Sequence, residues 1–237
     1  SNGMVDIATR ADTINRGRVT GGTVVIDAGG DVVNGVRVDG VQVRSAIIEA
    51  GTGGLQISAG RDVLNQGQIA SGGHALVSAG RDFVQDAAAN SSAAGAIKAQ
   101  AGSLSSAGST VVSAGRDAVL DQSGIQAGEH AVIDAGRDAK FTAATVSAGG
   151  SLAISAGRDI VSETVSDTVT RTVHKKEGNT RTTTTTTDET VTGSTFQAGG
   201  DLAMVAGRDI TLVAAEVYSD KGHIALSATR DLNLLAG

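Results

Sequence analysis

The chain has 237 residues with 33 Gly, no Pro and no Cys, and aromatic residues make up only 2% of it. Because Cys is absent, disulfides and thiolate metal sites are excluded, and because large rings are scarce, a core must be built from Ala, Val, Ile and Leu. The formal net charge is −6, with Arg and Asp interspersed, which argues against a nucleic-acid partner, since surfaces that bind nucleic acid carry a basic stripe with stacking aromatics.

The tetrapeptide Ala-Gly-Arg-Asp recurs six times and is the most regular feature of the sequence. Together with looser copies, it places an Asp at successive spacings of 19, 31, 20, 35, 21, 21, 50 and 22 residues. Most spacings are near 21, and the long ones are this period plus an insertion. Such self-similarity predicts a repeat architecture in which each unit is one structural coil. The aligned residues are Asp12, Asp31, Asp62, Asp82, Asp117, Asp138, Asp159, Asp209 and Asp231.

Each repeat contains three short strand patterns. Apolar residues occupy every second position before the Asp, as in Leu152-Ile154-Ala156, and again after it, as in Ile210-Leu212, which predicts β-strands. A third segment carries one apolar residue and ends in a Gly pair, and we expect these pairs to supply positive φ at the corners. The pairs are Gly21-Gly22, Gly72-Gly73, Gly149-Gly150 and Gly199-Gly200.

Three strands and three corners in about 21 residues close a coil whose next turn lies ~4.8 Å above it. The predicted fold is therefore all-β, a right-handed parallel β-helix forming a three-sided solenoid with an apolar interior. We interpret residues 1–237 as a single β-helix fragment of a longer protein, because the pattern continues up to Gly237. No apolar run approaches the ~20 residues of a transmembrane segment.

Two insertions interrupt the period. Residues 161–194 are Thr-rich, with Val165, Val169 and Val173 alternating with polar residues, and this pattern predicts a protruding β-hairpin. A disordered loop, or a segment that lies along neighbouring coils, is the alternative. Lys175, Lys176 and Arg181 are the candidate contact residues of this hairpin. A smaller insertion at residues 90–103 is rich in Ala and Ser and carries no recognisable chemistry.

Four amide side chains share one position, three residues after the Asp, in four successive repeats. They are Asn15, Asn34, Asn65 and Gln85. Stacked amides hydrogen-bond from one strand to the next in cross-β ladders, so we expect an amide ladder here. The alternative is that Asn merely favours turns.

The Arg-Asp pairs are the main charged constellation, and stacking places them in two columns. A polyanion-binding stripe or a carboxylate row for glycoside hydrolysis is the functional alternative to a structural turn. Hydrolysis needs two carboxyls of unlike pKa in a cleft, whereas these Asp residues are equivalent and each has an Arg beside it. We therefore predict a structural turn, formed by Gly60, Arg61, Asp62, Gly80, Arg81, Asp82, Gly115, Arg116, Asp117, Gly136, Arg137, Asp138, Gly157, Arg158, Asp159, Gly207, Arg208 and Asp209.

No catalytic residue, metal ligand or cofactor-binding residue is predicted. The calcium pattern of other Gly-Asp solenoids is missing, and His74, His130 and His223 fall in coils too far apart to share a metal. The sequence contains no phosphate loop, nucleotide fingerprint or Ser-His-Asp arrangement.

Two segments resemble the haemagglutinin repeat of the filamentous haemagglutinin family of Gram-negative exoproteins. They are Ser147 to Ile160, which reads SAGGSLAISAGRDI, and Gln197 to Ile210, which reads QAGGDLAMVAGRDI. The Thr-rich stretch that leads into Val191 to Thr195 also resembles an element of the second repeat region of contact-dependent growth inhibition exoproteins. The first resemblance extends over nearly the whole chain.

The resemblance implies a secreted, non-enzymatic segment of a large fibre on the cell surface of a Gram-negative bacterium. It further implies an outer-membrane partner transporter during export, and a role in adhesion or in toxin delivery to neighbouring cells, with a host or neighbouring-cell receptor or glycan as contact partner. The alternative function is a carbohydrate-binding or polysaccharide-degrading β-helix protein. That class usually presents aromatic sugar platforms, and here Tyr218 is the only Tyr and Trp is absent.

Overall fold

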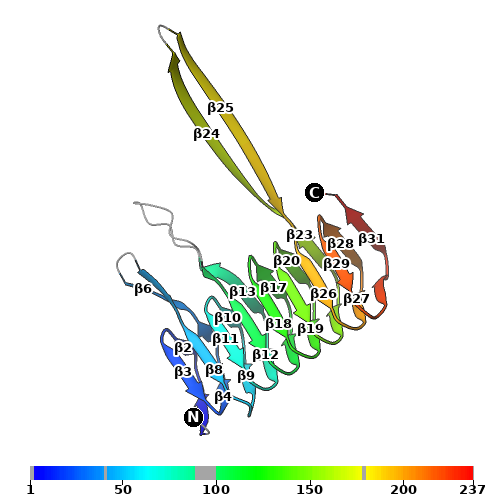
Figure 1. Cartoon of the computed structure of the whole chain (residues 1–237). Helices are drawn as coiled ribbons and strands as arrows, with labels where there is room; N and C mark the ends of the chain where they lie inside the picture. Colours follow the sequence, from blue (N-terminus) through cyan, green and yellow to red (C-terminus); the bar gives the residue numbers. More distant parts are fainter. Residues whose placement is uncertain (1–2, 40–41, 89–99, 178–179, 237) are drawn as a thin grey trace.

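The computed structural model describes residues 3–39, 42–88, 100–177 and 180–236, and the side chains at 36–39, 42–44, 88, 100, 175–177 and 180–182 lie outside this description. Three long parallel sheets form the three walls of a solenoid, and two antiparallel hairpins project from it (Figure 1). The predicted three-sided parallel β-helix with a protruding Thr-rich hairpin is therefore confirmed.

The first wall is built from the strands that precede each Asp. Its neighbours pair in register, so that Ile133 stacks on Ile154 and Ala135 on Ala156. The strands are, in order, β1 (Met4–Thr9), β4 (Thr23–Ala28), β9 (Leu55–Ala59), β12 (Ala75–Ala79), β16 (Thr110–Ala114), β19 (Ala131–Ala135), β22 (Leu152–Ala156), β27 (Leu202–Ala206) and β30 (Ile224–Ala228).

The second and third walls follow the Asp turn. The second comprises β2 (Thr13–Asn15), β5 (Val32–Asn34), β10 (Val63–Asn65), β13 (Phe83–Ala88), β17 (Ala118–Asp121), β20 (Ala139–Thr142), β23 (Ile160–Glu163), β28 (Asp209–Val213) and β31 (Asp231–Leu235), with the short β14 (Gln100–Ala101) pairing with β13. The third comprises β3 (Arg18–Gly21), β8 (Ile47–Ala50), β11 (Gln68–Ser71), β15 (Ser103–Ser106), β18 (Gly124–Ala127), β21 (Thr145–Ala148), β26 (Thr195–Ala198) and β29 (Glu216–Ser219).

The core is a thin column inside the three walls. In each wall alternate side chains point inward, as the period-two pattern requires, so Ile133 and Ile154 are buried whereas their neighbours along the strands are partly exposed. All three Phe residues of the chain lie in this column. Phe141 and Phe196 pack edge to face, with ring centroids 4.9 Å apart. The Phe rings therefore contribute to the packing of the core.

The prediction of positive φ at the corner Gly pairs is wrong. Among the described residues, the only glycine with positive φ is Gly54, while Gln122, Ala143 and Ala214 adopt it at another corner. The corners need glycine because successive coils approach closely: a Cβ on Gly149 would lie 2.2 Å from the carbonyl oxygen of Gly128. The constraint is therefore steric contact between coils, not backbone conformation.

The hairpins leave the solenoid at the corner between the second and third walls. One is β6 (Val36–Asp39) with β7 (Gln42–Ser45), and the other is β24 (Val165–Glu177) with β25 (Thr180–Thr192) (Figure 1). The long hairpin starts later than the predicted boundary of 161, because Val161 still pairs within the wall as part of β23. Residues 90–99 of the smaller insertion lie outside the described residues, and its last residue, Ser103, begins β15. No helix in the described part of the chain is long and apolar enough to cross a membrane.

Candidate functional site

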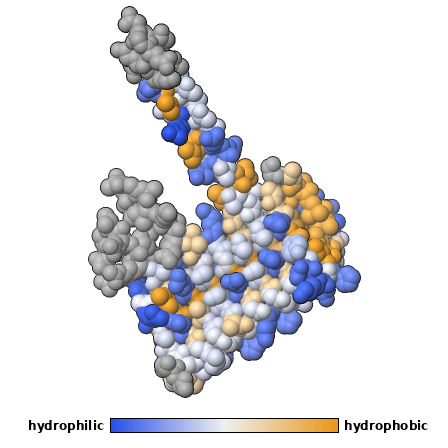
Figure 2. All heavy atoms as spheres, viewed as in Figure 1, coloured by the Kyte–Doolittle hydropathy of each residue, from blue (hydrophilic) through white to orange (hydrophobic). Residues whose placement is uncertain are grey.

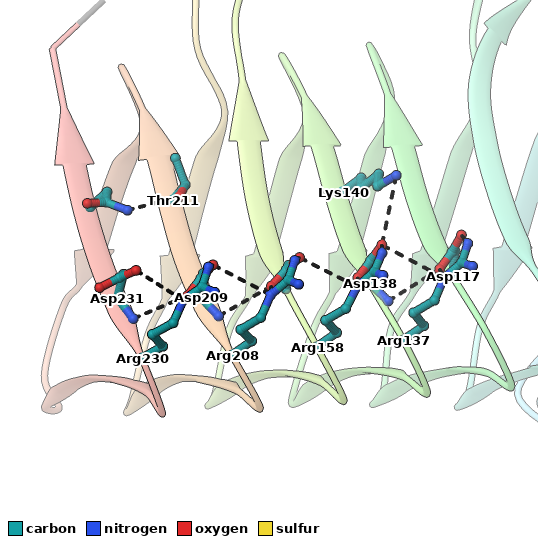
Figure 3. A network of polar contacts seen from close by, with 12 residues as sticks. Asp117, Arg137, Asp138, Lys140, Arg158, Arg208, Asp209, Thr211, Arg230 and Asp231 are labelled. Atoms are coloured by element: carbon teal, nitrogen blue, oxygen red, sulfur yellow. Dashed lines mark hydrogen bonds and ion pairs between the residues drawn. The ribbon is translucent and has the colours of Figure 1, made fainter.

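The Arg-Asp turns form a continuous ladder along one corner of the solenoid (Figure 3). Each Arg binds the Asp of the preceding coil with two nitrogens: Arg158 Nε donates to Asp138 Oδ1 at 2.7 Å, and Arg158 Nη2 donates to Asp138 Oδ2. The same arrangement joins Arg81 to Asp62, Arg116 to Asp82, Arg137 to Asp117, Arg208 to Asp159 and Arg230 to Asp209. Arg61 reaches both Asp31 and Asp12.

The same carboxylates also bind backbone amides of the next coil. Asp117 Oδ1 accepts the backbone N–H of Asp138 at 3.3 Å, and Asp62 Oδ1 accepts that of Asp82 at 3.1 Å. Several carboxylates are therefore held by the coil above through both a guanidinium and a turn amide, among them Asp62, Asp82, Asp117, Asp159 and Asp209. The aspartates are largely covered, with side-chain exposure of 3% for Asp138 and 11% for Asp117, whereas the arginines stay half exposed.

This hydrogen bonding shifts the acid–base equilibria of the ladder. The Arg137 guanidinium holds the pKa of Asp117 below its ordinary value of 3.8, because a bound cation favours the charged carboxylate. The pKa values of Asp62, Asp159 and Asp209 are lowered in the same way by Arg81, Arg208 and Arg230. The pKa values of these four carboxylates are shifted in the same direction, whereas acid–base hydrolysis needs two carboxyls of unequal pKa.

The four amide side chains of the first coils form an uninterrupted hydrogen-bonded chain. Asn15 donates to Asn34, Asn34 to Asn65, and Asn65 to Gln85, each at 2.9 Å. The second amide hydrogen of Asn65 goes to the carbonyl of Ser103 in the third wall, and Gln85 donates to the carbonyl of Gly124 at 2.7 Å. The ladder therefore ties two walls together inside the core, where Asn34, Asn65 and Gln85 are buried.

The long hairpin presents two different faces. One face carries Val165, Val169 and Val173 with Asp167 and Arg171 between them, since these residues alternate along β24. The other face is lined with hydroxyl groups, paired across the strands as Thr170 with Thr187 at 3.4 Å and Thr172 with Thr185 at 3.3 Å. The side chains of Lys175, Lys176 and Arg181 lie outside the described residues.

A shallow groove of about 320 Å³ lies on the outer face of the second wall. Asp121, Thr142 and Glu163 stack in successive coils at its edge, because their strands pair in register. The repeat pattern does not predict this groove, although acidic residues four positions after the ladder Asp in three coils are a signal for it. It is lined by Val119, Asp121, Lys140, Phe141, Thr142, Val161 and Glu163.

Metal-ligand geometry is absent from the described residues, where no group of three or more His, Asp or Glu side chains could hold an ion. His74 and His130 instead accept backbone amides of the next coil through Nδ1, from Ser109 at 2.9 Å and from Ser151 at 3.0 Å. These two side chains bridge coils, as the ladder aspartates do.

Comparison with known families identifies the repeat. The family model described as "Hemagglutinin repeat" matches residues 85–179 and 176–237, which together cover most of the chain. No curated protein matches the sequence, and no solved structure matches it either.

Proposed function

The chain belongs to the hemagglutinin repeat family, and we propose that it is a stalk segment of a large, secreted bacterial surface protein of the filamentous haemagglutinin type. Repeats of this family are generally non-catalytic and are typical of such exoproteins. In this role the solenoid extends the fibre and holds other parts of the protein away from the cell. Adhesion, or contact-dependent delivery of a toxin to a neighbouring cell, is the activity that the fibre serves.

The uniform coil-to-coil stacking carries this proposal. The ladder aspartates repeat the same contact along the solenoid, and their arginines neutralise them. A structure whose units contact only their neighbours can be lengthened without changing any unit. The same property suits export through an outer-membrane partner transporter, since each emerging coil can fold on the previous one.

The long hairpin is the proposed contact surface for a receptor or glycan on a host or neighbouring cell. Figure 2 shows it standing clear of the solenoid, with polar and apolar side chains alternating on its surface. Loops and projections on a rigid scaffold are where binding residues concentrate.

A paired binding and cleavage experiment tests the proposal. The 237-residue chain is applied to a glycan array and to intact cells, and is incubated with polysaccharides while reducing ends are counted. The matched control deletes residues 165–193, because joining Thr164 to Ser194 recreates the corner of the coil below, where Ala143 and Ala144 connect the second and third walls.

We expect no new reducing ends, and cell or glycan binding that is lost in the deletion variant. Turnover of a polysaccharide would overturn the proposal in favour of a β-helix hydrolase, whose active site would then be the groove beside Asp121 and Glu163. Binding that persists unchanged without the hairpin would overturn the assignment of the contact surface.

A further inference from the structure

The outer edge of β24 has no hydrogen-bonded neighbour among the described strands. Among the described residues, β24 and β25 form a sheet of two strands only, so each strand has one edge without a hydrogen-bonded neighbour. Figure 1 shows both edges standing away from the solenoid walls. Val169 is 58% exposed and Val173 is 48% exposed. A two-stranded ribbon is only marginally stable alone in water, and a free edge is a template for another strand.

The exposed edge has a nearly palindromic pattern, in which Asp167 and Arg171 occupy mirror positions about Val169. Residues 165–173 have the sequence VSDTVTRTV, in which Val occupies both ends and the centre. An antiparallel copy centred on Val169 therefore sets Val165 opposite Val173 and Val169 opposite Val169. It also sets Asp167 opposite Arg171 twice, and Thr168 opposite Thr170. Directly opposed apolar pairs and opposite charges are the pairs that stabilise antiparallel strands.

Neighbouring registers lack this match. Centring the pair on Asp167 or on Arg171 places two like charges opposite each other, which is destabilising. Centring it on Thr168 or on Thr170 sets Asp167 and Arg171 opposite valines. The charge pattern therefore selects the Val169 register over the registers slipped by two or four residues, in which the twofold axis moves by one or two positions.

We propose that the long hairpin is a dimerisation element, in which β24 of one chain pairs antiparallel with β24 of a second copy about a twofold axis at Val169. The two hairpins then form a four-stranded sheet, β25–β24–β24–β25. The valine face becomes continuous across the new strand pair, and each Asp167 carboxylate meets the Arg171 guanidinium of the other copy. Two solenoids are thereby joined through their hairpins and not through their ends.

Charge exchange tests the register. Sedimentation velocity of the 237-residue chain over a range of concentrations should show a monomer–dimer equilibrium. Asp167→Arg or Arg171→Asp alone should raise its midpoint concentration by about tenfold, because each puts two like-charge pairs in the interface. The double variant D167R/R171D should restore the midpoint. Exchanging the two charges should leave the electrostatic interactions within one hairpin unchanged, because Asp188 of β25 lies opposite Val169, midway between positions 167 and 171.

Three results would overturn the proposal. They are a chain that is monomeric at all concentrations, a midpoint that neither single variant changes, and a double variant no better than the single ones. An unchanged midpoint would assign association to the exposed apolar side chains of the last coil, such as Leu232 and Leu234. Far-UV circular dichroism on each variant separates lost association from lost folding.

A cysteine at the axis gives a second, independent test. The chain has no native Cys, so Val169→Cys introduces one thiol that faces its own copy across the axis. It should form a reducible covalent dimer under mild oxidation. Thr168→Cys is the matched control, because its copy lies diagonally away at about 7–8 Å between Cα atoms, beyond disulfide reach. Equal crosslinking of the two variants would contradict the register.

Discussion

At the residue scale, the Arg-Asp ladder makes every carboxylate depend on the coil above it. Asp117 receives both the Arg137 guanidinium and the Asp138 backbone amide. Such charge-assisted, bidentate contacts are stronger than ordinary surface ion pairs, and here one partner is largely covered. The ladder thus locks the vertical register of the coils from outside, while the stacked apolar side chains fill the interior.

The ladder should make the fold sensitive to acid. The pKa values of Asp62, Asp117, Asp159 and Asp209 are lowered by their arginines. A carboxyl with a lowered pKa stabilises the fold above its unfolded pKa and loses that contribution as the pH falls through its folded pKa. We expect the ladder's contribution to the melting temperature to be constant between about pH 7 and 5 and to fall below about pH 4, as measured by thermal circular dichroism.

Asp117→Asn separates the ladder from general acid effects, because it keeps the shape and removes the charge. It should lower the free energy of unfolding at pH 7 by about 2 kcal/mol, and its melting temperature should fall less between pH 5 and 3 than that of the parent chain. Asp6→Asn is the control, since Asp6 is exposed on β1. If the parent chain and the Asp117 variant lose the same stability in acid, the ladder is not the acid-sensitive element.

Asp86 should change the pH dependence of stability in the direction opposite to that of the ladder aspartates. Burial, together with the neighbouring Asp121, raises its pKa, against a weak hydrogen bond from Gln66, and its Oδ1 is buried without a partner. A raised pKa means that stability is lost as the pH rises through the folded pKa. Asp86→Asn should therefore raise the melting temperature at pH 7 by about 1–3 °C and leave it unchanged near pH 3. Asp27→Asn, at an exposed position of β4, is the control, and a variant of Asp86 that melts lower at pH 7 would contradict this account.

At the element scale, the amide ladder is a network in which no member can be replaced alone. Asn65→Leu should cost about 2–4 kcal/mol, because three buried groups each lose the bond they make with Asn65: an amide hydrogen of Asn34, the Oε1 of Gln85 and the carbonyl of Ser103. Leu itself is compatible with this column, since Leu120 stacks next to Gln85. Urea unfolding measures the loss.

The triple variant N34L/N65L/Q85L should be at least as stable as N65L alone, since it replaces the polar column by an apolar one. Additive losses from the three substitutions would show that each amide acts independently through its own wall contacts. The expected non-additivity is the signature of a hydrogen-bonded chain.

The sequence predicts the walls well and the corners poorly, for a physical reason. Alternation such as Leu152-Ile154-Ala156 states which side chains face inward, because burial has a period of two in any strand. The function of Gly149, in contrast, depends on its distance to Gly128 in another coil. The bidentate partner of Arg158 is Asp138 of the preceding coil, while the adjacent Asp159 is a more distant ion-pair partner at 3.5 Å. Contacts between coils depend on how the coils stack in three dimensions, so the local sequence of one repeat does not predict them.

At the scale of the whole molecule, the solenoid is a stack of units that are interchangeable in register. Residues 118–138 comprise one complete coil, since Ala118 pairs with Ala139 one coil above it. Removing that coil brings Asp117 beside Arg158, in the place that Asp138 holds in the intact ladder, and it leaves Phe141 in contact with Phe196.

Deleting residues 118–138 should therefore give a folded, shorter solenoid with the same far-UV circular dichroism spectrum per residue. Its free energy of unfolding should fall by only the contribution of one coil and one interface, because stability in such stacks is a sum of nearest-neighbour contributions. Deleting residues 118–133 instead removes an incomplete coil and should prevent cooperative folding, since the following strands then meet the wrong walls. If the full-coil deletion also abolishes folding, the coils are not equivalent, and the solenoid is a single specialised domain, not an extendable stalk.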